Sequence, residues 1–251
     1  MSVLELQADV TYGPINSRRL GRSLGINLLP VDRKLCTFDC VYCQYGSARP
    51  VSVRARGFPT VETVMEGMEE ALGRLPSPPD YLTFSGNGEP TLHPRFPEIV
   101  REVCRLRDRV CPETRVAILS NSSRVNNPEV RRALVALDDP IMKLDAGDPA
   151  TMARINRPAA GVRFEEIMQG LAALPGLIIQ SMIISGQVQN ALGEAHERWL
   201  SAIAELSPRE VQIYSSERPV AETGVQQVPK DELDDLATRA EQRVGVPVRA
   251  Y

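Results

Sequence analysis

The strongest constraint on this fold is an alternation of strand and helix patterns that recurs six times along the chain. Each unit begins with a short apolar run rich in β-branched residues, and continues with a segment whose apolar residues recur every three or four positions. This order predicts a parallel sheet with helices outside it. The expected strands are 24–29, 81–85, 116–120, 141–145, 177–184 and 211–214, and the expected helices are 60–75, 97–109, 128–137, 164–174, 191–206 and 230–244.

Six units, where a closed barrel would have eight, indicate an α/β fold of the partial (βα)6 barrel type, with parallel strands and one open side. A flat doubly wound sheet is the alternative, and periodicity does not separate the two. The chain has 251 residues, of which 43% are hydrophobic, and a folded chain of this size buries about 70% of its unfolded surface. We therefore expect a single domain over residues 1–251, with its core at about 22–216 and a C-terminal helix at about 230–244.

Composition also restricts the compartment. The longest apolar run, Leu177–Ile184, is far shorter than the roughly 18 residues of a membrane span. The segment Met1–Val10 carries acidic residues and no basic region, so it does not resemble a signal peptide. Five cysteines without a secretory signal do not indicate a disulfide framework. These features predict a cytoplasmic protein with no membrane partner.

The polar motifs of the chain follow its predicted strands. Three cysteines follow the first strand, Ser85–Pro90 follows the second, and Ser120–Ser122 ends the third. Lys143 and Asp145 lie on the fourth. In either architecture the C-terminal strand ends meet at one edge, where the chemistry of such folds is found. We therefore expect these motifs to share one site.

The three cysteines form a C-x3-C-x2-C pattern at Cys36, Cys40 and Cys43, within a segment called here the cysteine loop (residues 35–43). Thiolates at such short spacing bind a soft metal or an iron–sulfur cluster. Three ligands to a [4Fe–4S] cube leave one iron without a protein ligand, and an open coordination position is typical of a catalytic metal site. The alternatives are a zinc site completed by His93 or His196, or three free thiols.

This pattern, with Tyr42 directly before the last cysteine, resembles the cluster loop of the radical S-adenosylmethionine (SAM) superfamily. The segment 12–27 is similar to single-domain, stand-alone members related to tRNA wybutosine synthase, and the resemblance covers about residues 12–220. It implies a partial (βα)6 barrel that binds a [4Fe–4S] cluster and SAM. It further implies reductive cleavage of SAM to methionine and a 5′-deoxyadenosyl radical, which abstracts hydrogen from a substrate. A flavodoxin or ferredoxin would supply the electron.

The resemblance also implies a set of residues that bind SAM. Ser85–Pro90, called here the Gly-Glu motif, is similar to the Gly-Gly-Glu motif of the superfamily, with Glu89 as acceptor for the SAM ammonium group. Its glycines allow a strand end to approach a ligand closely. Residues 120–122 are candidates for the SAM carboxylate or ribose, although a turn or helix cap explains them equally well. The complete candidate set is Tyr42, Gly86, Asn87, Gly88, Glu89, Ser120, Asn121, Ser122, Lys143, Asp145 and Met182.

Lys143 is notable because the chain has only three lysines. Lys143 and Asp145 are two positions apart on a strand and so project from the same face. Buried charges are costly unless they are paired. The resemblance suggests Lys143 for the SAM carboxylate and Asp145 for the ribose, whereas a structural ion pair at the barrel mouth is the competing interpretation. Met182 lies where the family packs adenine, but core packing explains it equally well.

The substrate is not determined by the sequence. A net charge of −3 and a pI near 5.6 argue against a protein that binds nucleic acid over its whole surface.

The remaining cysteines, Cys104 and Cys111, are interpreted as ordinary buried thiols, and a second cluster would need three more. A single-cluster tRNA-modifying enzyme of wybutosine type and a non-catalytic iron–sulfur or zinc module remain alternatives, and the substrate could be a protein or a nucleic acid. Basic residues that could face an anionic substrate, or form a solvated surface, are Arg18, Arg19, Arg22, Arg33, Lys34, Arg49, Arg54 and Arg56.

Overall fold

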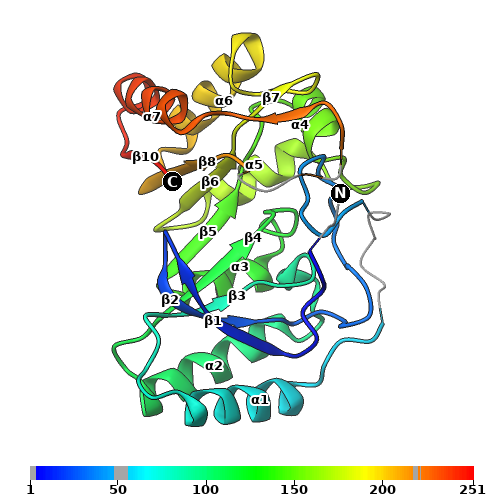
Figure 1. Cartoon of the computed structure of the whole chain (residues 1–251), viewed down its shortest axis with the longest axis vertical. Coiled ribbons are helices and arrows are strands. Elements are labelled where there is room, and N and C mark those ends of the chain that lie inside the picture. Colours follow the sequence, from blue (N-terminus) through cyan, green and yellow to red (C-terminus); the bar gives the residue numbers. More distant parts are fainter. Residues whose placement is uncertain (1–3, 48–55, 217–219, 221) are drawn as a thin grey trace.

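The computed structural model describes residues 4–47, 56–216, 220 and 222–251, so Arg49 and Arg54 of the basic clusters lie outside the described residues. Eight strands form one open sheet in the order β1-β2-β3-β4-β5-β6-β8-β10 (Figure 1). From β2 to β10 all neighbours are parallel. The six expected strands are β2 Gly21–Ile26, β3 Tyr81–Phe84, β4 Arg115–Ser120, β5 Asp139–Lys143, β6 Ile178–Met182 and β8 Glu210–Tyr214.

The six expected helices also form, and they begin where the sequence signals lie. The Thr60 hydroxyl accepts a hydrogen bond from the Thr63 amide (3.2 Å), and the Asn127 side chain caps the next but one helix through the Glu129 amide (2.9 Å). Within the described residues, none of the helices combines the length and hydropathy that a membrane span requires. The helices are α1 Val61–Arg74, α2 Phe96–Val110, α3 Pro128–Val135, α5 Phe164–Ala172, α6 Gly193–Leu206 and α7 Lys230–Val244.

The main core lies between these helices and the outer face of the sheet. On α1, Val64 and Met68 are fully buried, and they belong to the same apolar cluster as Leu24, Leu82 and Phe84 of the neighbouring strands. This arrangement follows from the apolar face of each helix, which recurs every three or four residues. Because the helices cover the outer face, the inner face of the sheet is left for the site.

Several short elements were not predicted. Strand β1, Thr11–Ser17, pairs antiparallel with β2 and forms a hairpin at one edge of the sheet. Its sequence contains Gly13-Pro14 and few apolar residues, and most of it is exposed or half-buried, so it lacks the alternation that identifies a strand. The others are the helices η1 Pro90–Leu92 and α4 Pro149–Ile155, and the strands β7 Ile184–Gly186, β9 Val225–Gln227 and β10 Val248–Ala250.

The turn between β1 and β2 folds over the inner face of the sheet. Leu20 in this turn packs against Ala117, Ile141 and Ile178, which come from β4, β5 and β6. The hairpin therefore reaches across the inner face toward the opposite half of the sheet (Figure 1).

A buried ion-pair cluster lies at the start of β5. Asp139, whose side chain is 5% exposed, accepts hydrogen bonds from Arg115 Nε (2.9 Å) and Tyr81 Oη (2.7 Å), and it also pairs with Arg209. Burial raises the pKa of Asp139, but the bonds from Arg115, Tyr81 and Arg209 outweigh burial and leave the pKa below its ordinary value. The ionised carboxylate therefore joins β3, β4 and the segment before β8.

We expect Asp139→Asn to lower the free energy of unfolding at pH 7 by about 2 kcal/mol, since the half-exposed arginines lose a buried partner but remain screened by solvent. Because the pKa of Asp139 is lower in the folded than in the unfolded state, its ionised form stabilises the fold at any pH above the unfolded pKa of about 3.9. This contribution is lost as the pH falls through the folded-state pKa. The difference between wild type and variant should therefore shrink below about pH 4. Urea unfolding at pH 7 and pH 3.5 measures it, with the exposed Asp108→Asn as control. A difference that persists undiminished at low pH contradicts this account.

Candidate functional site

The cysteine loop is held on one side by the Gly-Glu motif. Leu35 forms a parallel bridge with Gly88. The Leu35 amide donates to the Asn87 carbonyl (2.8 Å), and the Glu89 amide donates to the Leu35 carbonyl (3.0 Å). The two motifs that the sequence placed after separate strands are therefore in direct main-chain contact, as their position at one edge predicts.

On its other side the cysteine loop is held by the end of α4 and the segment after it, residues 155–159. Phe38 bridges Pro158, the Val41 amide donates to the Ile155 carbonyl (2.9 Å), and the Ala159 amide donates to the Thr37 carbonyl (2.8 Å). Sequence reasoning missed this segment. The available signal was Asp148 directly before Pro149, a typical helix start, and Asp148 does cap α4 through the Thr151 amide (2.9 Å).

Both glycines of the Gly-Glu motif are needed for chain packing. Gly88 has φ +141°, and a Cβ there would lie 1.9 Å from the Leu35 carbonyl oxygen. Gly86 has φ +134°, and a Cβ there would lie 2.6 Å from Asn27 Oδ1. On the side where a Cβ would project, the two glycines approach Leu35 and Asn27, and their approach to a ligand stays a prediction.

The thiols of the cysteine loop accept hydrogen bonds from side-chain amides. Asn121 Nδ2 lies 3.4 Å from Cys36 Sγ, and Asn156 Nδ2 lies 3.3 Å from Cys40 Sγ. Burial raises the pKa of the Cys36 thiol to about 12 and that of the Cys40 thiol to about 11. Donors to sulfur are typical of metal-bound thiolates, whose negative charge they stabilise, and a bound metal would displace the thiol protons.

Lys34 adds a positive charge beside the same loop. Its Nζ donates to the Gly46 carbonyl (2.8 Å) and lies 3.6 Å from Asp39. Burial lowers the pKa of Lys34, but the negative charges of Cys43 and Cys36 as thiolates and of Asp39 together outweigh burial and leave the pKa above its ordinary value. A charged lysine at this position favours thiolate over thiol.

This donor set fits an iron–sulfur cluster better than a zinc site completed by histidine. His93 is held by the Pro59 carbonyl (2.9 Å) and the Arg95 amide (3.1 Å), and His196 lies 3.3 Å from the Asn190 carbonyl and stacks on Trp199. Among the described residues, no three His, Cys, Asp or Glu side chains are arranged around a single metal position. In a cube each cysteine binds a different iron, so the thiols need not converge on one point.

The two other cysteines lie on or next to α2. Cys111 is buried, as expected. Cys104 is only half-buried, so the prediction that it is buried was wrong. It lies where α2 meets α3, with its Sγ 3.9 Å from the Ala136 carbonyl.

Glu89 is 1% exposed and connects the ends of β3 and β4 to the cysteine loop. Its carboxylate accepts hydrogen bonds from the Thr91 amide (3.0 Å), Ser120 Oγ (2.9 Å) and the Asn121 amide (2.6 Å). Burial raises the pKa of Glu89 above its ordinary value. Since Asn121 Nδ2 also reaches Cys36 Sγ, Glu89 orients a donor to one of the cysteines.

Two further candidates contact other parts of the chain. Asn87 is fully buried, and its side chain bonds the Gln7 amide (2.7 Å) and the Pro30 carbonyl (2.9 Å), so it fixes the N-terminal segment. Ser122 Oγ donates to the Lys143 carbonyl (2.8 Å) and so joins β4 to β5. Both side chains therefore have a protein partner, and the SAM contact expected of them stays a prediction.

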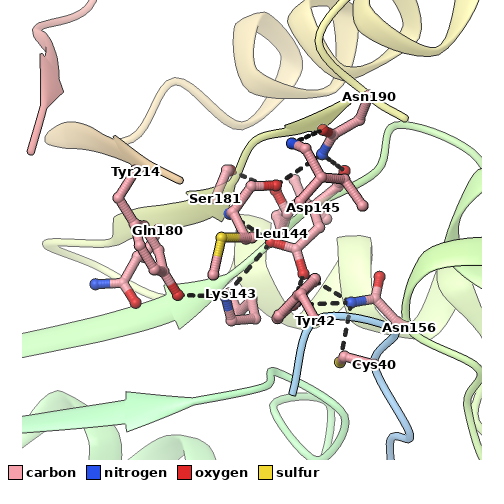
Figure 2. A network of polar contacts seen from close by, with 12 residues as sticks. Cys40, Tyr42, Lys143, Leu144, Asp145, Asn156, Gln180, Ser181, Asn190 and Tyr214 are labelled. Atoms are coloured by element: carbon pink, nitrogen blue, oxygen red, sulfur yellow. Dashed lines mark hydrogen bonds and ion pairs between the residues drawn. The ribbon is translucent and has the colours of Figure 1, made fainter. Parts of the chain in front are cut away.

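Asp145, two residues beyond the end of β5, lies at the centre of a second network (Figure 2). One oxygen accepts from the Met182 amide (2.8 Å), and the other accepts from Asn156 Nδ2 (2.7 Å) and from the Tyr42 hydroxyl. Lys143 Nζ lies 3.5 Å from the first oxygen, so the pair does share one face, as predicted. Both carboxylate oxygens thus have protein donors, which matches the structural ion pair considered as the competing interpretation.

This network continues to the inner face of the sheet. Lys143 Nζ donates to Tyr214 Oη (2.9 Å), and it lies 5.0 Å from the centre of the Tyr42 ring. Burial lowers the pKa of Lys143, but Asp145 and Tyr214 outweigh burial and raise the pKa above its ordinary value. The Met182 side chain packs in an apolar cluster with Tyr42 and Ile155. Asn156 is the residue that sequence reasoning missed here, because only the fold brings it to Cys40.

The fold and the cysteine loop together define a class of protein, and the sequence model of the radical SAM superfamily matches residues 34–186. The chain therefore belongs to the radical SAM superfamily. It is an enzyme, and the cofactors of its family are a [4Fe–4S] cluster and SAM.

More particular relatives are UPF0026 proteins. The protein slr1464 of Synechocystis sp. is 31% identical over 265 residues, which cover 95% of this chain and 94% of that relative. The protein MJ1312 of Methanocaldococcus jannaschii is 34% identical over 218 residues, or 85% of this chain; this match spans 65% of that relative, less than two thirds of its length. A structure of TYW1 with a lysine–pyruvate adduct has a TM-score of 0.63 at 16% identity, covering 88% of this chain and 73% of TYW1, and so confirms the fold.

Proposed function

We propose that Cys36, Cys40 and Cys43 bind a [4Fe–4S] cluster, that SAM binds at the iron which they leave open, and that residues 1–251 act as one domain. When bound, such a cluster supplies the electron that cleaves SAM to methionine and a 5′-deoxyadenosyl radical, which abstracts hydrogen from a substrate. The observation that carries this proposal is the main-chain contact of Leu35 with Gly88. It brings the thiols next to the strand end that resembles a SAM-binding motif.

The residues of the chain divide into two roles under this proposal. Glu89, Asn121 and Asn156 position the cysteine loop, because each is hydrogen-bonded to it directly or through one neighbour. The charged Lys143, at the inner face, is suited to a carboxylate of SAM, while Asp145 keeps Lys143 and Tyr42 in place. The main-chain groups of 86–88 and the Tyr42 ring complete the proposed SAM site.

A cavity of about 510 Å³ lies beside this site and is suited to the substrate. It is lined by Gln44 and Tyr45, which directly follow Cys43, and by Ser85 and Tyr214 at strand ends. Binding sites for small molecules typically measure roughly 300–1,000 Å³. A flavodoxin or ferredoxin in a reducing cytoplasm would supply the electron.

Anaerobic reconstitution with iron and sulfide tests this function. We expect about four irons and four sulfides per chain and a brown protein, and we expect 5′-deoxyadenosine to form only when both SAM and dithionite are present. Chemical iron and sulfide analysis and mass spectrometry measure these outcomes. A colourless protein with one zinc ion contradicts the cluster. A brown protein that forms no 5′-deoxyadenosine indicates an electron-transfer module.

A further inference from the structure

Arg19 is half-buried, and one nitrogen of its guanidinium group has no hydrogen-bond partner among the described residues. Arg19 Nη1 is buried, and no acceptor lies within reach among the residues that the structure describes. Leaving such a group unpaired is unfavourable, above all when the group is charged. Buried polar groups are otherwise nearly always satisfied. The position of Arg19 therefore indicates a ligand that is brought from outside the chain.

The turn between β1 and β2 fixes Arg19 at the cavity described above. The Arg19 and Leu20 amides donate to Ser17 Oγ (3.2 and 3.1 Å), and Leu20 is buried against the inner face of the sheet. The guanidinium carbon lies 4.5 Å from the centre of the Tyr214 ring. Because its main chain is held by the turn and its guanidinium packs on Tyr214, the guanidinium is preorganised, which reduces the entropy lost on binding.

The charge of the cavity favours an anion. Arg18 and Arg19 line it, and the single acidic residue among its described lining residues is Glu5. Lys143 also contacts Tyr214, 5.0 Å from the centre of the same ring that Arg19 covers. Lys143 is paired with Asp145, so it adds no unpaired charge. Arg19, whose Nη1 has no acceptor among the described residues, lies at this partly enclosed space, and its charge attracts oxyanions.

We propose that Arg19 binds an anionic group, a carboxylate or a phosphate, of a small-molecule substrate in this cavity; this rests on the function proposed above. A guanidinium matches both groups with two parallel N–H bonds. Tyr12 Oη and Ser85 Oγ, which pair with each other at 2.5 Å, line the same cavity and offer further hydrogen bonds. The substrate would thus be held by its charged end, with its reacting carbon toward the cysteine loop.

Calorimetric titration of the reconstituted protein, saturated with SAM and without reductant, tests this proposal with inorganic phosphate and with acetate as separate probes. We expect saturable binding of one of them to wild type, which also identifies the class of anion. Arg19→Gln should weaken it at least about tenfold and Arg19→Lys less, because lysine keeps the charge but not the paired donors. The exposed Arg101→Gln on α2 is the matched control and should bind as wild type does.

Three results would overturn the proposal. The first is that neither anion binds to wild type, a measurement that does not depend on any variant folding. The second is that Arg19→Gln binds the anion as well as wild type. The third is that Arg19→Gln weakens SAM binding about tenfold, which would assign the arginine to the SAM carboxylate. Since none of these titrations requires SAM cleavage, failure here is distinct from absence of 5′-deoxyadenosine.

Discussion

Gly88→Ala is expected to lower the iron content of the reconstituted protein at least about tenfold, the range found when residues that support metal ligands are replaced. The added Cβ would lie 1.9 Å from the Leu35 carbonyl oxygen, and alanine is strained at φ +141°. The main chain at Leu35 must shift to make room for the Cβ. Since Leu35 is next to Cys36, this shift also moves a cysteine of the cysteine loop. Formation of 5′-deoxyadenosine should fall to the level of Cys40→Ala, which lacks one thiol ligand.

The matched control for this prediction is Gly73→Ala. Gly73 lies in α1, and a Cβ there would meet no atom within 4 Å. Alanine favours a helix over glycine by about 1 kcal/mol, so this variant should keep its iron and be slightly more stable. Circular dichroism of both variants tests whether they retain the fold. A Gly88→Ala protein with full iron and activity would show that the contact between the two motifs is not needed.

The sequence was sufficient to predict the six parallel strands, the six helices and the edge at which the motifs gather. These depend on local patterns, namely apolar periodicity and capping residues such as Thr60 and Asn127, together with the rule that parallel strand ends share an edge. The contact of Leu35 with Gly88 is a consequence of that rule.

The partners of the site residues could not be predicted, because they depend on distant parts of the chain. Asn156 is 116 positions from Cys40, and Gln7 is 80 positions from Asn87. Polar residues of this kind look the same in a sequence whether they bind a ligand or another segment. The resemblance predicts that Glu89, Asn121 and Asp145 bind SAM, and the structure adds that all three side chains are hydrogen-bonded within the chain.

Asp145→Ala is expected to lower the free energy of unfolding by about 4 kcal/mol, in the range for removing one partner of a buried ion pair. The substitution leaves the Met182 amide, the Asn156 amide group and the Tyr42 hydroxyl without their acceptor, and Lys143 without its nearest negative charge. Asp145→Asn should cost about half as much, since one carbonyl oxygen still accepts. Thermal or urea unfolding of the protein without SAM measures the loss.

Asp108→Ala is the control, because Asp108 is 67% exposed and its pair with Arg107 is on the surface; its effect should stay within about 0.5 kcal/mol. Unfolding without SAM separates the two interpretations of Asp145. If its main contact were the ribose, the SAM-free variant would be as stable as wild type and only SAM binding would weaken. Because Asn156 donates to both Asp145 and Cys40, the structural interpretation requires that the variant also hold its cluster less tightly. Loss of stability and loss of iron should therefore occur together.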